Sequence, residues 1–422
     1  MGPRLSVLID FTREKFGLEQ YNLHHYSFSR TIDLFKNTNY TLCMEWFPDF
    51  IDDELLEEGL NPEGAAVIEI DINSYHTKSA IFVGEKSYSN QYTFSGLDTR
   101  EIINWVEEQT NLTFNKQFHL VEVEKGRLYF KSCLNGQEVS PFGDIELKYD
   151  YDGRIIFFSV NGHFPNLDLQ LKEDYTLSLE KIDELKRAQL KLIDYPSAIY
   201  KKLIEIYAVE EIYIKNDLST IPYEVSLIGK EHLKIDKIIT WESRLSDQFE
   251  RKEIAIIEEI PEELAFSGES HPDLIPISEQ EREKCEIAVT NFLRQQYPFD
   301  SGNWKLSELC RDKGYIHAIL AGSEKKSCVL QRKLLLIIDR VTLEVLNYLD
   351  NKFMLETFDL YRLPERIVIS EEDAYEKLKD YFELKPTFVY DHEQKQYILC
   401  GKLDCAYGIN ASTGEIIELN NL

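Results

Sequence analysis

The sequence predicts a β-rich α+β protein, and three observations support this prediction. Aromatic residues are abundant, with 24 Tyr and 23 Phe against 3 Met, and flat rings pack well on the pleated face of a sheet. Alternating apolar stretches are separated by Asn-Gly and Asp-Gly pairs, which are typical of hairpin turns. Several of these stretches follow segments with helical spacing of apolar residues. The predicted building unit is therefore a helix followed by antiparallel hairpins.

The composition is that of a folded globular protein, with 43% hydrophobic and 29% charged residues in 422 positions. This length allows two to four domains. The order of helix-like and strand-like patterns predicts three segments. These are an N-terminal α+β domain over 1–175, a second helix-plus-hairpins unit over 176–265, and a C-terminal pair of repeats over 266–422.

The first segment is predicted to be a domain with a β-meander. Residues 1–60 are rich in Phe, Tyr and His, and their fold is not predicted. A helix is expected to open at Asp98, because Glu101 follows three residues later as in a capping box. Strands are expected around this helix and in the meander that follows it, at 67–72, 80–83, 118–123, 127–133, 146–151 and 155–160.

The second segment begins with apolar residues at helical spacing over 178–193, which predict an amphipathic helix. Strand-like stretches follow at 211–214, 223–228, 233–241 and 254–257. Residues 258–277 are acidic and contain three prolines, and they are predicted to be a linker.

The third segment contains the clearest internal repeat. Ser278 and Ser370 each precede an acidic first turn and an apolar helical pattern, so each predicts a capped helix. Each helix is followed by strand-like stretches and a closing phrase, Asp339-Arg340-Val341-Thr342-Leu343-Glu344 or Asn410-Ala411-Ser412-Thr413-Gly414-Glu415. Asp or Asn followed by Ser, Thr and Gly predicts a tight turn between two strands. The first copy is longer, which predicts an insertion over 300–326.

Residues 277–346 and 369–417 resemble PepSY-type repeats, in which a capped helix is followed by strands that end in a "vDa-TGe-i" phrase. Their arrangement is most similar to tandem PepSY-like proteins of the YcdB/YcdC type, known largely from Gram-positive bacteria. The resemblance implies tandem units, each a helix packed on an antiparallel β-meander. PepSY modules are associated with restraint of peptidases, so the resemblance also implies a peptidase as a possible partner.

Charge and cysteine usage limit the partners and the location. The net charge is −28, with 75 acidic and 47 basic residues, so nucleic acid and anionic membranes are not expected as partners, whereas a basic protein or peptide is. The seven cysteines are scattered without a CxxC motif, which is the usage of a reducing compartment. The N-terminus has no apolar leader pattern, and the longest aliphatic run, 334–338, is too short for a bilayer. A cytoplasmic location is expected.

No catalytic, cofactor-binding or metal-binding residue is predicted. The segment Asp150-Tyr151-Asp152-Gly153 is similar to part of an EF-hand loop, but Lys148 and Ser159 stand where that loop needs its first and twelfth ligands. Ser323-Glu324-Lys325-Lys326 fits SxxK without its partner motifs, and HExxH, GxSxG, Walker A and GxGxxG motifs are absent from the sequence.

The leading hypothesis from the sequence is a non-enzymatic protein that binds or regulates a protein or peptide, with a peptidase among the possible partners. The alternative is a hydrolase-like enzyme with a site in the first 95 residues, formed by His24, His25 or Cys43. A purely structural protein is a third hypothesis, which rests on family analogy alone.

Overall fold

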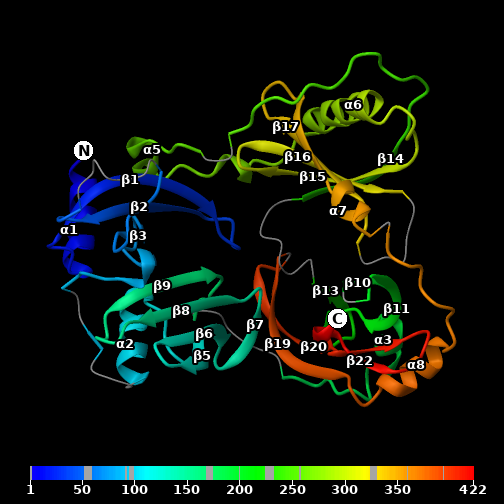
Figure 1. The fold of residues 1–422 in the computed structure, drawn as a ribbon, viewed down its shortest axis with the longest axis horizontal. Coiled ribbons are helices and arrows are strands. Elements are labelled where there is room, and N and C mark those ends of the chain that lie inside the picture. Colours follow the sequence, from blue (N-terminus) through cyan, green and yellow to red (C-terminus); the bar gives the residue numbers. More distant parts are fainter. Residues whose placement is uncertain are drawn as a thin grey trace. The chain divides into compact units, whose positions relative to one another are not determined.

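The protein is a mixed α+β protein, as predicted, with 41% of its residues in strands and 21% in helices (Figure 1). The computed structural model describes residues 2–51, 59–90, 93–94, 99–167, 174–198, 200–223, 232–255, 258–323, 330–358, 360–392 and 394–422. The predicted helix start at Asp98 and most of the predicted strand 223–228 lie outside the described residues, as does most of the SxxK segment.

The chain forms two compact units that are interleaved along the sequence. Unit 1 consists of Met1–Glu173, Glu258–His271 and Thr387–Ile398, and unit 2 of Asp174–Ile257, Pro272–Pro386 and Leu399–Leu422. The three consecutive segments described above remain a prediction about sequence organisation.

Unit 1 is built on one antiparallel sheet. Two short segments join it from later in the chain, α5 (Glu262–Ser267) and the hairpin end of β19 and β20. The strand order is β1-β2-β3-β4-β9-β8-β6, with β5 and β7 both pairing with β6. The main elements are α1 (Pro3–Lys15), β1 (Tyr21–Ile32), β2 (Thr38–Pro48), β3 (Ala66–Asp71), β4 (Thr77–Phe82), η2 (Val83–Glu85), α2 (Thr99–Thr110), β5 (Phe118–Glu124), β6 (Arg127–Leu134), β7 (Gln137–Ser140), β8 (Gly143–Tyr149) and β9 (Ile155–Gly162).

Unit 2 contains two hydrophobic cores. One core lies under α6, on one face of the five-stranded meander β14-β15-β16-β17-β18, and the other lies around α3 and α8. The elements are α3 (Asp183–Gln189), β10 (Leu190–Ser197), β11 (Lys202–Val209), β12 (Ile212–Ile214), β13 (Thr220–Pro222), β14 (His232–Ile239), η3 (Pro272–Leu274), α6 (Glu279–Gln296), β15 (Trp304–Asp312), β16 (Tyr315–Gly322), β17 (Lys333–Asp339), β18 (Val345–Asp350), α7 (Lys352–Glu356), α8 (Glu371–Leu378), β19 (Glu383–Asp391), β20 (Gln396–Asp404), β21 (Tyr407–Asn410), β22 (Ile416–Glu418) and η4 (Leu419–Asn421).

Three local predictions were wrong. The helix expected over 178–193 is the short α3, because Leu190 and the residues after it pair with β11 instead. The expected linker 258–277 contains α5 and η3, and its first part packs on unit 1, where Tyr40 Oη donates to the carbonyl of Glu269 at 2.8 Å. The described part of 300–326 is mainly the hairpin β15-β16, which corresponds to β19-β20 in the other copy and is therefore no insertion. Ten residues of the added length lie in α6, which has 18 residues against 8 in α8.

A helix followed by at least four strands occurs five times in the described residues, and in one of these segments the short extra strand β7 lies between the second and third of the four. We call these segments modules 1 to 5. Within residues 1–60, whose fold the sequence left unassigned, the stretch from Pro3 to Pro48 contains the helix and first two strands of module 1. The modules are α1 with β1–β4, α2 with β5, β6, β8 and β9, α3 with β10–β13, α6 with β15–β18, and α8 with β19–β22.

The turn between the third and fourth strands has one geometry in modules 1, 4 and 5. In module 4 the carboxylate of Asp339 accepts hydrogen bonds from the N–H groups of Val341 and Thr342 at 2.9 and 2.7 Å. Leu343 then adopts a positive φ of 59°. Asn410 and Asp71 make the same pair of bonds, followed by positive φ at Gly414 and Tyr75. The predicted turn is therefore confirmed in both closing phrases, and a third copy at Asp71 was missed.

The turn of module 2 is one residue shorter. The carboxylate of Asp150 accepts from the N–H groups of Asp152 and Arg154 at 2.9 and 2.8 Å, and Gly153 adopts the positive φ. Because this carboxylate is occupied by its own backbone, the segment is a hairpin turn, as the sequence favoured over a calcium loop.

Modules 3 and 5 exchange strands. In modules 1, 2 and 4 the four strands of one module pair in order, but β11 pairs with β21, and β20 pairs with β12. The resulting four-stranded groups are the sheet β10-β11-β21-β22 and the run β19-β20-β12-β13, in which β19 also pairs in parallel with β7. Each group therefore takes two strands from one module and two from the other, so each of these modules is completed only by its partner.

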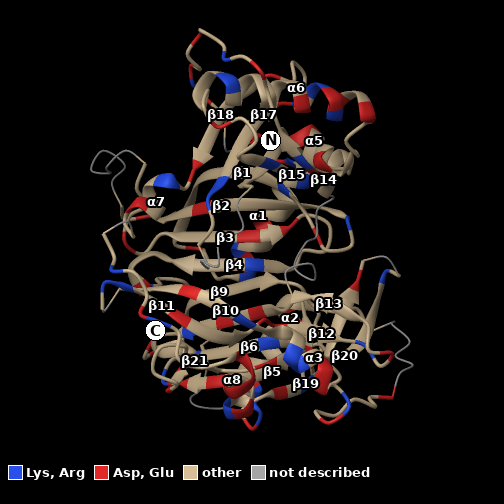
Figure 2. Ribbon diagram, turned by 90° about the vertical axis from the view of Figure 1, so that its right-hand side faces the viewer, with Lys and Arg blue, Asp and Glu red and all other residues tan. Residues whose placement is uncertain are grey.

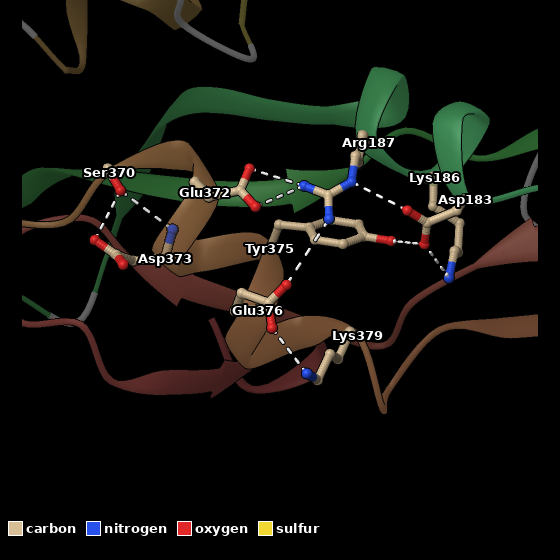
Figure 3. A network of polar contacts seen from close by, with 9 residues as sticks. All are labelled: Asp183, Lys186, Arg187, Ser370, Glu372, Asp373, Tyr375, Glu376 and Lys379. Carbon is tan, nitrogen blue, oxygen red and sulfur yellow. Dashed lines mark hydrogen bonds and ion pairs between the residues drawn. The ribbon is translucent and has the colours of Figure 1, made fainter. Parts of the chain in front are cut away.

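A polar network joins the helices of the two exchanged modules (Figure 3). The Tyr375 hydroxyl on α8 donates to Asp183 of α3 at 2.6 Å, and Arg187 contacts both carboxylate oxygens of Glu372 at 2.8 Å. The hydroxyl bond from Tyr375, followed by Lys186 and Arg187, lowers the pKa of Asp183. Exposed ion pairs add little stability. The main contribution of this network to stability therefore comes from Tyr375, which is only 3% exposed.

Candidate functional site

The residues of the alternative enzyme hypothesis lie on the sheet of unit 1. His24 is exposed and stacks on Phe47 at 4.1 Å, next to the register shift between Leu23 and His25. Cys43 lies on β2 opposite Ser27. Burial, followed by Glu69 and Glu45, raises the pKa of the Cys43 thiol to about 11. A thiol with a raised pKa is a poor nucleophile at neutral pH, so these contacts do not favour cysteine catalysis.

A groove on module 4 is a candidate site. It has a volume of about 610 Å³ and lies between α6, the closing turn of the module, and a stretch of chain that follows β14. Its lining residues are Gln248, Phe249, Glu250, Lys252, Lys284, Ile287, Ala288, Asn291, Phe292, Gln295, Thr342, Leu343, Glu344 and Val345. The size and mixed lining are those of a site for a small molecule or a few residues of peptide.

Local sequence explains how α6 forms one wall of the groove. Ser278 caps the helix, since its hydroxyl accepts from the N–H of Glu281 and the Glu281 carboxylate accepts from the N–H of Ser278. This capping box was predicted and is confirmed. Phe292 and Val289 face the core below, whereas Ile287 on the groove side is 61% exposed. An apolar side chain is therefore presented to solvent at the groove.

The second wall is a segment of residues 241–255, which we call the strap. At its start, the backbone N–H of Trp241 donates to Ser301 Oγ at 2.9 Å. The guanidinium of Arg294 on α6 donates to the carbonyl of Ser243 at 2.7 Å. Further on, the N–H of Lys252 donates to the carbonyl of Leu346 at 2.8 Å. The strap thus runs from the end of α6 to the edge strand β18.

Aromatic side chains form the junction between the strap and the module. The Phe249 ring lies edge-on to Phe292 at 4.8 Å and to Tyr348 at 5.9 Å. The guanidinium of Arg251 lies 4.1 Å from the Tyr348 ring centre. Such aromatic and cation–π contacts each contribute about 0.5–1.5 kcal/mol beyond the area that they bury.

The charges at the groove are of both signs. Lys252 pairs with Glu344 at 3.1 Å, while Glu250 and Lys284 lie on the rim. Acidic residues are also spread over α6, α8 and several strands (Figure 2), in keeping with the net charge of −28. The wider surface therefore attracts positively charged segments.

Sequence reasoning missed the groove because its walls are distant in the chain. The strap and α6 are separated by more than 20 residues, and α6 and the closing turn by more than 40. The prediction of a strand at 254–257 was not confirmed for Ile254 and Ala255, which are in neither a helix nor a strand. The signal that marks the strap is the pair Trp241 and Phe249 in an otherwise polar stretch.

The described residues contain neither a metal cluster nor a membrane-spanning helix. Within them, no group of three or more His, Cys, Asp or Glu side chains is arranged to hold a metal ion. None of the helices described is both long and apolar enough to cross a bilayer.

Comparison with known proteins adds little. No protein-family model matches the chain, and no curated protein matches it. Among solved structures, the Bacillus megaterium YpeB C-terminal domain is similar over 82% of this chain and 96% of that chain, with 8% sequence identity and a TM-score of 0.23. A likeness at this TM-score carries no argument about function. The resemblance to PepSY-type repeats therefore remains a prediction from sequence.

Proposed function

We propose that this chain is a non-enzymatic docking protein, built from PepSY-like repeats, that binds a protein or peptide at the groove of module 4. The observation that carries the proposal is the groove itself, with the exposed Ile287, aromatic walls and a charged rim beside an edge strand. Apolar patches with a polar rim are typical of interaction sites. Edge strands also accept extended peptides as an added strand.

The partner of this proposal is basic, because the chain carries 75 acidic residues and complementary charge speeds capture. A peptidase is a specific candidate, on the basis of the sequence resemblance to PepSY modules. The proposal requires no cofactor and places the protein in the cytoplasm, as its cysteine usage predicts.

The test is a comparison of two variants in affinity capture from a lysate of the native host. Ile287→Glu places a charge in the groove, and Phe299→Glu places one at another exposed position, where Phe299 is 83% exposed. We expect one stoichiometric partner with the wild type and with Phe299→Glu, and its loss with Ile287→Glu and at high salt. Recovery of the same proteins with both variants would refute binding at the groove.

A further inference from the structure

One wall of the groove, the strap, makes ligand-like contacts with module 4. Phe249, Arg251 and Lys252 each contact module 4 with a different chemistry: an aromatic ring on Phe292, a cation on the Tyr348 ring, and an ammonium on the Glu344 carboxylate. These are the contacts by which a peptide ligand would be recognised at this surface.

The backbone of the same segment also behaves as a ligand strand. Strand β18 pairs with β17 on one side only, and it is the last strand of its sheet. On its other side, Lys252 donates its N–H to Leu346 at 2.8 Å and accepts from the Asn347 side chain at 3.1 Å. Lys252 therefore occupies the position of the first residue of an added strand.

This segment is held weakly. Residues 248–252 form neither a helix nor a strand, and Gln248, Glu250, Arg251 and Lys252 are exposed. Segments with few buried apolar groups and exposed backbone open with low free energy. An extended ligand that makes the same contacts would compete with them without unfolding the sheet below.

We propose that residues 248–252 are a displaceable internal ligand, and that the surface of module 4 that they cover, together with the β18 edge, accepts an extended peptide with an aromatic residue followed, two and three positions on, by Arg or Lys. This inference rests on the proposed docking function and specifies its ligand. The chemistry is read from Phe249, Arg251 and Lys252. Their receptor groups are Phe292, Tyr348 and Glu344.

The internal ligand has a measurable consequence. A peptide added in trans competes with a segment that is covalently attached, so the apparent affinity of the wild type is reduced by the fraction of molecules in which the site is open. If that fraction is about 1–10%, releasing the segment improves the apparent affinity about 10- to 100-fold.

The experiment uses the full chain and a fluorescent peptide with the sequence of residues 246–255, Ser-Asp-Gln-Phe-Glu-Arg-Lys-Glu-Ile-Ala. Binding is measured by anisotropy for the wild type and for Phe249→Ser/Arg251→Ser, in which the internal contacts are removed. We expect the released variant to bind the peptide at least tenfold more tightly than the wild type. A scrambled peptide is the control for non-specific charge attraction.

A charge exchange identifies the receptor. In the released variant, Glu344→Lys is expected to weaken binding of the peptide at least fivefold, and replacement of the peptide's Lys by Glu is expected to restore it. A second released chain, with residues 247–253 replaced by Gly and Ser, controls for any repacking caused by the point changes, and circular dichroism confirms that each variant is folded.

Equal binding of the peptide by the wild type and both folded released chains would overturn the internal ligand, as would absence of binding to all of them. That result is distinguishable from failure of the proposed function. If Ile287→Glu still abolishes partner capture, docking at the groove stands and the strap has no ligand role. If Ile287→Glu has no effect, docking at the groove fails independently.

Discussion

His163 should make unit 1 sensitive to acid. Its ring lies 4.7 Å from Phe35 and 6.4 Å from Tyr397, and its Nε2 has no hydrogen-bond partner among the described residues. Burial lowers the pKa of His163 from 6.5 to about 4, and the nearby Asp33 only partly opposes this effect. The imidazole is therefore neutral in the folded protein at pH 5.

The sign of the pH dependence follows from proton binding. Between pH 6.5 and about 4 the unfolded chain binds a proton at this histidine and the folded chain does not, so the free energy of unfolding falls as the pH falls. The gap between 6.5 and about 4 corresponds to at most about 3 kcal/mol, at about 1.4 kcal/mol for each pKa unit. The full stabilisation is present above pH 6.5 and is lost progressively toward pH 4.

The variant His163→Phe keeps a ring between Phe35 and Tyr397 but does not titrate. We expect the loss of unfolding free energy between pH 6.5 and 4.5 to be about 2–3 kcal/mol smaller than in the wild type. The assay is urea unfolding at several pH values, followed by hydrogen exchange in unit 1. His25→Phe, on the exposed side of β1, is the matched control. An unchanged pH dependence in His163→Phe would refute the reasoning.

Three further predictions concern the exchanged modules. A cleavage site for a specific protease can be inserted after the exposed Glu356. After cleavage the two fragments should still elute together in gel filtration, because β20 and β21 pair with module 3. Separate elution would contradict the exchange. Gly414→Ala should lower the free energy of unfolding by about 1–2 kcal/mol in urea unfolding, since φ is 72° there. Gly322→Ala should not, because the added methyl group meets open space. Tyr375→Phe should cost about 1 kcal/mol through loss of the bond to Asp183. An equal cost for Tyr381→Phe would argue against that bond.

The sequence predicted elements whose causes are local. The capping box at Ser278 and the closing turns at Asp339 and Asn410 each depend on residues within six positions, so their patterns identify them directly. The copy at Asp71 follows the same rule and was missed because Ser74 and His76 stand where the other two phrases share a Thr and a Glu. The α+β class followed from these signals together.

The candidate site could not be predicted in the same way. Phe249 reads in sequence as one aromatic residue in a polar stretch, and its contacts to Phe292 and Tyr348 depend on chain separated from it by more than 40 residues. The hypothesis of a hydrolase site formed by His24, His25 or Cys43 gained no support, although distance along the chain was not the obstacle. These residues are close in the chain or on neighbouring strands, but burial raises the pKa of the thiol.

By itself, then, the sequence predicted the capped helices at Ser278 and Ser370, the strands of the first meander, the closing turns at Asp339 and Asn410 and the acidic character of the surface. Tertiary structure decided which strands pair. The strands β20 and β21 are separated by only two residues, yet β21 lies against β11 and β20 against β12. Strand pairing depends on backbone hydrogen bonds that any extended segment offers, so the choice of partner is made by packing of the shared core around α3 and α8.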